Sequence, residues 1–514
     1  MSENSDKKGS EKEATEKKVV PKSKPSEKAD IAAHNTDQQK AGEYHLEEGH
    51  SWANAWKFAA GAAVIGLGAA FALGGGDPKR LAFSYLFAFI AILTPALGSL
   101  FFILQQHLTA SGWSVTIRRT AEIFASGLMI FALLFVPIWM MRGHLFPWIN
   151  ESAEHSEVAT THTTAADLAA QPAGTETPAQ RHERQQTGPA NANDGHGNLA
   201  NPAMLGAGMN GLAGVHEPVM NANERGEHGD PNELEEEHTL HAKRAYLNEG
   251  FFGIRAIIYL ALWAWLGWTF LARSTKQDET KDPKITNSTK RFSMGAVYIF
   301  GFSLTFASFD WIMSLDPLWF STVFGVYVFA GSAVSAYALI ILTTMGLRAS
   351  GKLVKEINVE HYHDMGKLMF GFVVFWAYIG FAQFMLIWYA AIPEETTFFH
   401  NRWDHGPWAI VSMSLVVLNF IVPFFVLISH NAKRKLGILA FGSAWLLFMH
   451  IVDIYWLVMP NFGQDGFSIS WLDAACLIGV GGAYFAVVFY RMSKVALIPV
   501  GDPRLQRALQ FENS

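Results

Sequence analysis

Cysteine is almost absent from this sequence. The 514 residues include a single one, Cys476. One thiol excludes a Cys₄ iron–sulfur cluster, a C-x-x-C-H haem attachment and a disulfide framework built within this chain. The chain is therefore expected to carry no covalently attached or Cys-ligated redox centre of its own.

Other signatures of cofactor sites are missing as well. No Walker or Rossmann glycine pattern occurs in the right context, so no nucleotide site is indicated. A haem b site needs two histidines at matching depth on facing helices. His450 lies deep in an apolar run, whereas His107, His400 and His430 lie at the ends of such runs. We therefore expect neither haem nor a metal ion bound by this chain.

The first 49 residues lack any apolar stretch and are rich in Lys, Glu and Ser. A secretory signal peptide needs an apolar segment, so this region is not expected to be one. Its composition is typical of a solvated chain that cannot bury a core. We interpret residues 1–50 as a disordered tail.

Long apolar runs, in contrast, are abundant, and half of the residues are hydrophobic. A helix of about 20 apolar residues crosses a bilayer. Ten runs reach this length: 52–73, 81–106, 117–141, 250–272, 292–313, 319–346, 367–391, 407–430, 436–459 and 469–491. The sequence thus predicts an all-α integral membrane protein of about ten transmembrane helices, helices 1–3 within 51–149 and helices 4–10 within 249–493.

Basic residues alternate between the loops. Loops 107–120, 273–291, 347–367 and 431–435 are basic, and 273–291 alone holds six Lys or Arg. Loops 314–318 and 460–468 hold none, and 392–406 holds only Arg402; loop 74–80 departs from the pattern with Lys79 and Arg80. By the positive-inside rule both termini, including the tail 494–514, are cytoplasmic. In a bacterium this places the chain in the inner membrane.

The segment 150–248 is then a long external loop, periplasmic in a Gram-negative cell. Between residues 151 and 241 it has eight His, fifteen Asp or Glu and three Arg, and it has too few large apolar residues to form a core. The spacing of the histidines matches no defined metal site. A flexible insertion is the preferred interpretation, with specific metal binding as the alternative.

The two apolar runs between Arg291 and Gly346 form a hairpin around a very short loop. The second run carries small residues along one side, namely Gly325, Gly331, Ser332, Ser335 and Ala336, which let helices approach closely. Helices 2–5 and 6–9 are predicted to form two four-helix bundles, with two further helices outside them. Each bundle would end on a helix with an acid near its outer end, Asp310 or Asp453.

Ionisable groups inside a membrane are costly and mark partners or pathways. Candidates for a proton path or for quinone contact are Asp310, Asp453, His450, Arg255, Glu122, Gln383 and His107. His450 and Asp453 are three residues apart and share a helix face. The competing interpretation is a buried network that fixes helix packing, such as Arg255 paired with Asp310 or with Asp453. No catalytic residue and no metal ligand is assigned.

Several longer stretches carry a resemblance to a known family. They are Lys243–Asn248, Phe309–Pro317, Phe320–Tyr327, His363–Leu368, Trp388–Ala390, Ile392–Thr396 and His450–Trp456. Together they resemble one of the two paralogous membrane subunits of bacterial alternative complex III, a quinol:cytochrome c oxidoreductase. The subunit in question is the paralogue of the one thought to hold the main quinol site, and both are related to the NrfD/polysulfide-reductase membrane subunits. The family usually has a short connection where this chain has about ninety residues after Trp148.

The resemblance implies a membrane subunit of a respiratory quinol:cytochrome c (or electron-acceptor) oxidoreductase. Such a subunit anchors partners and either binds quinone or conducts protons, without a redox cofactor of its own. The implied partners are an iron–sulfur subunit, c-type cytochrome subunits, a paralogous NrfD-like subunit, a terminal oxidase in some assemblies, and lipids, with no nucleic acid. A stand-alone secondary transporter and a purely structural scaffold subunit of the same complex are the alternatives.

Overall fold

The computed structural model describes residues 44–149, 238–404, 406–463 and 467–512. Within these ranges the protein is built of helices and turns, with no strand, and ten helices are long and apolar enough to cross a membrane. The predicted all-α, multi-pass architecture is therefore confirmed. The tail 1–43 and most of the predicted external insertion, 150–237, lie outside the described residues. "Inner" and "outer" below follow the predicted orientation.

The ten spans keep the predicted order. The first three are α2 (Ser51–Leu73), α3 (Pro78–Leu108) and α4 (Val115–Ser126), which continues through η2 (Gly127–Ile130), α5 (Phe131–Leu134) and α6 (Val136–Met140). The next four are α11 (Glu249–Thr280), α12 (Pro283–Trp311), α13 (Phe324–Ala349) and α14 (Val359–Ala390). The last three are α16 (Gly406–Ser414) with η4 (Leu415–Ile421) and α17 (Val422–Leu427), then α19 (Leu436–Val458) and α20 (Trp471–Met492).

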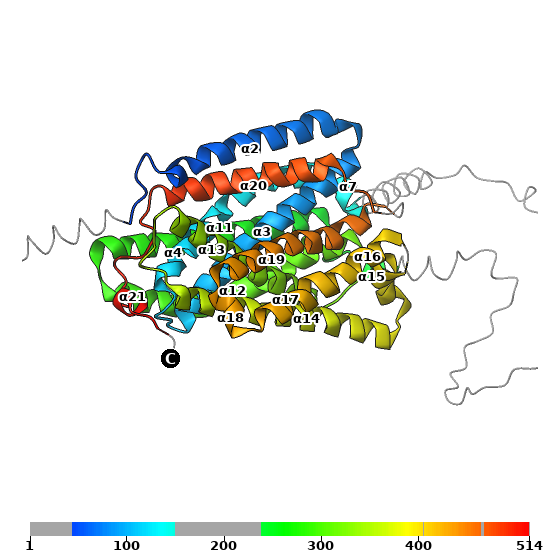
Figure 1. The fold of residues 1–514 in the computed structure, drawn as a ribbon. Helices are drawn as coiled ribbons and strands as arrows, with labels where there is room; N and C mark the ends of the chain where they lie inside the picture. Colours follow the sequence, from blue (N-terminus) through cyan, green and yellow to red (C-terminus); the bar gives the residue numbers. More distant parts are fainter. Residues whose placement is uncertain (1–43, 150–237, 405, 464–466, 513–514) are drawn as a thin grey trace, which may run out of the picture.

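The helices pack as two four-helix groups and a pair. One group is α3, the α4–α6 span, α11 and α12; the other is α13, α14, the α16–α17 span and α19. The remaining helices, α2 and α20, lie side by side along one edge (Figure 1). Contact between α3 and α13 joins the two groups, and these two helices are the most deeply buried. This is the predicted arrangement of two bundles and two further helices.

Several predicted helix boundaries on the inner side are wrong. The segment 273–291 was expected to be a basic loop, but α11 runs to Thr280 and α12 begins at Pro283. Pro283 occupies the first turn, and the Asp282 side chain accepts a hydrogen bond from Lys284 N at 2.9 Å, so a helix start is encoded there. Hydropathy finds where a helix leaves the apolar layer, not where its hydrogen bonds stop. The same reason applies to α14, which begins at Val359 rather than at 367.

Small residues set the distance between α3 and α13. A β-carbon on Gly98 would lie 1.9 Å from the carbonyl oxygen of Ser332 and 2.6 Å from the Ala336 β-carbon. The predicted face of small residues at 332–336 therefore packs directly against the backbone of α3. Since both neighbours are part of a buried helix, neither can move aside at low cost.

The central contact gives a first prediction. Gly98→Leu should prevent α3 from closing on α13 and should cost more than the roughly 1–3 kcal/mol of ordinary core overpacking, because the clash is with backbone. Thermal unfolding in detergent, followed by size-exclusion chromatography, measures the loss. The matched control is Gly371→Leu on α14, where a β-carbon meets nothing within 4 Å. Equal melting temperatures for the two variants would contradict the proposed close contact.

Candidate functional site

Asp310 forms a buried ion pair with Arg255. The carboxylate is fully buried on α12 and accepts from Arg255 Nε and Nη2, each at 2.8 Å, and from the Tyr259 hydroxyl at 3.0 Å. Arg255 itself lies over the ring of Tyr246, 3.9 Å from its centroid, and donates to the Tyr246 carbonyl. A two-bond pair of this kind neutralises both charges and fixes α11 against α12. Arg255 thus pairs with Asp310, as the packing interpretation anticipated, and not with Asp453.

Asp453 has a different environment. It is buried on α19, where Oδ1 accepts from the Tyr327 hydroxyl at 2.5 Å and Oδ2 accepts from Trp376 Nε1 at 3.1 Å. Among the described residues, no Lys, Arg or His lies within ion-pair distance of this carboxylate. Two neutral donors satisfy its oxygens without cancelling its charge. A buried acid without a counter-ion is suited to gain and lose a proton.

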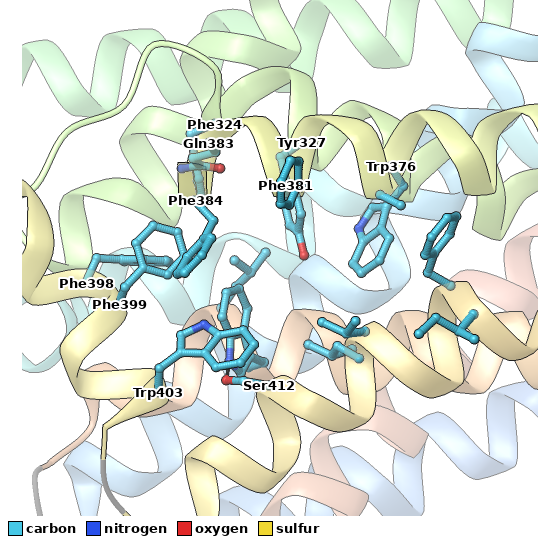
Figure 2. A pocket seen from close by; sticks show the side chains of 18 residues that line it. Phe324, Tyr327, Trp376, Phe381, Gln383, Phe384, Phe398, Phe399, Trp403 and Ser412 are labelled. Carbon is cyan, nitrogen blue, oxygen red and sulfur yellow. Dashed lines mark hydrogen bonds between the residues drawn. The ribbon is translucent and has the colours of Figure 1, made fainter. Parts of the chain in front are cut away.

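A large cavity lies directly beside the Asp453 donors. Its volume is about 420 Å³, and its wall includes both Tyr327 and Trp376. The other walls are largely aromatic and come from α14, α15 (Pro393–Trp403), the α16–η4 segment and the outer end of α19. The lining includes Phe381, Phe384, Phe398, Phe399, Trp403, Phe420 and Trp456. Figure 2 shows the rings of α14 and α15 converging on this space.

Gln383 provides a polar group in the cavity wall that makes no hydrogen bond within the described structure. The side chain lines the cavity and is 5% exposed, and its Nε2 has no hydrogen-bond partner in the described structure (Figure 2). An amide N–H in an apolar wall can donate to a carbonyl or hydroxyl oxygen of a ligand. Of the sequence-predicted candidates, Gln383 and Asp453 therefore come together at one cavity, Asp453 through Tyr327 and Trp376.

The cavity opens sideways between α14 and η4. Three lining residues are also on the outer surface of the helices: Phe381 on α14, and Val416 and Ile421 on η4. Because these helices are apolar on their exposed faces, the opening faces the lipid layer rather than water. A ligand with a hydrocarbon tail can reach this cavity from the bilayer.

The wall formed by η4 is a π-helix of residues Leu415–Ile421. Pro423 follows it and lacks the N–H that the Asn419 carbonyl would otherwise accept from, which favours a break in the α-helical ladder. Trp445 Nε1 donates to the Leu418 carbonyl at 2.8 Å and stabilises the altered turn. Such π-segments are frequent at functional sites. Hydropathy predicted the span but not this irregularity.

His450 lies next to Asp453 on α19 but is not bonded to it in the described structure. Its Nε2 is 2.7 Å from the Thr94 hydroxyl of α3, and its ring lines a small space together with Asp453 and Asn419. His450 thus joins the two bundles at the level of the candidate site. The predicted shared face of His450 and Asp453 is confirmed.

Glu122 belongs to a separate inner cluster of charges. It is fully buried and accepts from Arg118 Nε at 2.9 Å and Arg119 Nε at 3.1 Å. Arg118 continues to Asp502 at 2.7 Å, and Arg119 to Asp278 at 2.6 Å. This network of two arginines and three acids ties the residues after α20 to α4 and α11. Glu122 is therefore part of a structural clamp, and it lies in a different bundle from the cavity.

His107 is buried near this cluster and stacks on Phe270 with ring centroids 5.7 Å apart. Its Nδ1 has no hydrogen-bond partner in the described part of the chain. No group of three or more His, Cys, Asp or Glu side chains among the described residues is arranged to hold a metal ion. His107 does not reach the Asp453 cavity.

Sequence reasoning missed the residues that shape the site, namely Tyr327, Trp376, Asn419 and Arg402. Arg402 is fully buried on α15, where it donates to the carbonyls of Phe398, Trp456 and Leu457 and lies over the Phe398 ring. It therefore fixes the outer wall of the cavity. Tyr327 stood within a motif that carried the resemblance, but its partner is 126 residues away, and spacing alone gives no such pairing.

Comparison with protein-family models and with curated proteins found no match.

The contrast between the two acids gives a second prediction. Asp310→Asn leaves the buried Arg255 without its counter-charge and should destabilise the fold by about 3–5 kcal/mol. Asp453→Asn should change stability by less than about 1 kcal/mol, because an amide of the same shape can keep both bonds when the Tyr327 hydroxyl accepts instead of donating. Thermal melts of both variants in the same detergent measure the difference. Similar losses would show that Asp453 is also a packing residue.

The inner clamp gives a third prediction. Asp502 lies beyond the last span; burial opposes its ionisation, but Arg118 and Arg504 outweigh burial and hold the pKa of its carboxyl well below the usual range. Its stabilising contribution is therefore present above the ordinary aspartate pKa of about 4 and is lost as the pH falls below it.

Asp502→Asn should accordingly release the terminal segment at neutral pH, because two arginines lose their shared partner. Limited trypsin digestion after Arg504 and Arg507 should become about tenfold faster or more, the change expected for a loss of ~1.4 kcal/mol in local opening. Glu512→Gln, at an exposed position, is the control. Unchanged cleavage in the Asp502 variant would mean that the clamp does not hold this segment.

Proposed function

We propose that this chain is a membrane subunit of a bacterial respiratory complex that oxidises quinol, and that the aromatic cavity binds the quinol head group. The observation that carries the proposal is the cavity itself, which combines an apolar aromatic wall, one free amide donor and a buried acid reached through Tyr327. Quinone rings are flat, apolar and polar only at two opposite oxygens. A site of this composition matches them.

The lateral opening supports a ligand that dissolves in the membrane. An isoprenoid tail can remain among lipids at Phe381, Val416 and Ile421 while the head group lies between the rings of α14 and α15. A transporter of polar solutes would need a water-accessible, polar cavity near the middle of the membrane. The largely apolar lining argues for quinol over that alternative.

The resemblance stated from the sequence also supports this function. Two of the stretches that carry it, Phe320–Tyr327 and His450–Trp456, are far apart in the chain but meet at the cavity. Phe324 and Tyr327 come from the first stretch, and Asp453 and Trp456 come from the second. We propose with it the inner-membrane location, cytoplasmic termini and the cytochrome and iron–sulfur partners that the resemblance implies.

The residues of the site suggest how a proton leaves quinol. One quinol hydroxyl donates to the Tyr327 oxygen, and the Tyr327 hydroxyl already donates to Asp453 Oδ1. When the quinol hydroxyl loses its proton to Tyr327, the Tyr327 proton moves to Asp453, which becomes neutral. Gln383 Nε2 donates to the second oxygen of the ring and holds it in place. This transfer accounts for one of the two protons of quinol. The second leaves from the hydroxyl held by Gln383 to solvent, and the two electrons pass to redox centres of the partner subunits.

A fourth prediction tests the cavity. Ala377 lines it, whereas Val374, one turn earlier on α14, faces outward. Ala377→Phe should fill the head-group space and weaken binding of a short-tail naphthoquinol and a short-tail benzoquinol by more than about tenfold, or ~1.4 kcal/mol. Val374→Phe should bind both as the native chain does. Affinity is measured on the chain purified in mild detergent with the subunits that accompany it.

The same preparation tests the assembly. A visible spectrum with c-type cytochrome bands, together with peptides of an iron–sulfur subunit, is the expected result. A colourless homo-oligomer would overturn the respiratory function and favour the transporter. A coloured complex whose quinol binding is unaffected by Ala377→Phe would instead assign this chain a scaffold role.

A further inference from the structure

A second, much smaller space lies on the inner side of Asp453. It is lined by Gly331, Asn419, His450 and Asp453 among others, and the room open to the centre of a water molecule is about 10 Å³. That value is at the lower limit of what one buried water needs, and such a water also needs two to four polar partners. Three of the lining side chains are polar. The space therefore has both the size and the chemistry of a single-water site.

Two polar atoms face the same point in this space. A β-carbon on Gly331 would lie 3.4 Å from His450 Nδ1 and 3.6 Å from Asp453 Oδ2. No direct hydrogen bond joins these two side chains in the described structure. A water molecule displaced from that point toward the two side chains, clear of the Gly331 Cα, is within reach of both.

The hydrogen of the His450 ring is fixed by Thr94. The Thr94 hydroxyl donates to the carbonyl of Ile90 at 2.8 Å, so its one hydrogen is already used. With that hydrogen on the Ile90 carbonyl, the 2.7 Å contact between Thr94 Oγ1 and His450 Nε2 is made by a hydrogen on Nε2. In the neutral ring, Nδ1 is left as an acceptor, and it faces the small space.

Gly331 and the π-helix create the space. The extra residue in the turn of η4 places Asn419 at its wall, and the missing side chain of Gly331 on α13 leaves room opposite. Close packing of α13 with α19 does not by itself require glycine there, because a β-carbon would make ordinary contacts of 3.4–3.6 Å. The glycine instead keeps the point between His450 and Asp453 unfilled.

We propose that one water molecule binds between His450 Nδ1, Asp453 Oδ2 and the Asn419 side chain, and that it relays a proton from Asp453 to His450. The proposal rests on the proposed function, because the proton that moves is the one that Asp453 receives from quinol. The protonated Asp453 carboxyl turns about its Cβ–Cγ bond, so that the oxygen that received the proton faces the water. It then gives that proton to the water, and the water gives a different proton to Nδ1. The products are the Asp453 carboxylate and a His450 imidazolium that still donates from Nε2 to Thr94. Asp453 is then ready for the next turnover.

The fifth prediction concerns Gly331→Ala in the purified full-length chain with its accompanying subunits. The variant should fold without strain, and its new methyl group should displace the water. Quinol binding should stay within about twofold of the native value, while proton release coupled to quinol oxidation should slow on the order of 10²-fold, the lower range for a positioned proton-transfer group. Gly371→Ala on α14, where nothing lies within 4 Å of a β-carbon, is the control for a helix glycine-to-alanine change.

A second measurement does not depend on turnover. Infrared difference spectra in H₂¹⁸O should show one isotope-sensitive buried water band in the native chain and in the Gly371 control, but not in Gly331→Ala. Absence of that band from the native chain, or unchanged proton release in Gly331→Ala after its loss, would overturn the relay. If quinol does not bind to the native chain, the proposed function fails and the relay fails with it. If quinol binds normally but the band is missing, the relay alone fails.

Discussion

The cost of placing charge in an apolar layer governs the arrangement of this protein. Each buried charge must find a counter-charge, a set of donors or a proton. Arg255 and Asp310 use the first solution and close the first bundle at its outer end. Asp453 uses the second, with Tyr327 and Trp376 as its donors and no nearby cation in the described residues. The two bundles therefore differ in chemistry although their helices are arranged alike.

Close helix contact and open space are both set by residues without large side chains. At Gly98 the backbone of α13 occupies the space that a side chain would need, so glycine is required there for close helix packing. At Gly331 the surrounding atoms stand at ordinary contact distance from a β-carbon, so packing does not explain the glycine. The aromatic cavity persists for a related reason. Its rings are held by contacts within and behind its wall. Trp456 Nε1 donates to Ser412, another lining residue, and Phe398 stacks on Trp319, which lies outside the lining.

The sequence predicts the spans well because hydropathy depends on local composition, and ten apolar runs became ten helices. It predicts Asp310, Asp453 and Gln383 as significant because a polar group in such a run is costly wherever its partner lies. It does not predict the partners. Predicting that Asp310 pairs with Arg255 and Asp453 with Tyr327 requires knowing how each helix is rotated about its axis. The cavity is also hard to predict, because its wall comes from five chain segments. The π-helix depends on where Trp445 reaches, which is also a tertiary fact.

Three arginines on the outer side bear on orientation. Arg80 is buried with Asp473 at 2.5 Å and Ser468, Arg255 with Asp310, and Arg402 with the carbonyls at the end of α19. A charge that is bonded inside the fold contributes to packing and should not be counted as a free loop charge. Arg80 in loop 74–80 is therefore a weaker exception to the positive-inside rule than the sequence indicates. With that orientation, Asp453 and the cavity lie in the outer half of the membrane, and His450 lies one turn further inward. Under the proposed function, a proton on Asp453 would have two routes, outward through the cavity or inward through His450, and the small space beside Gly331 would decide whether the inward route is connected.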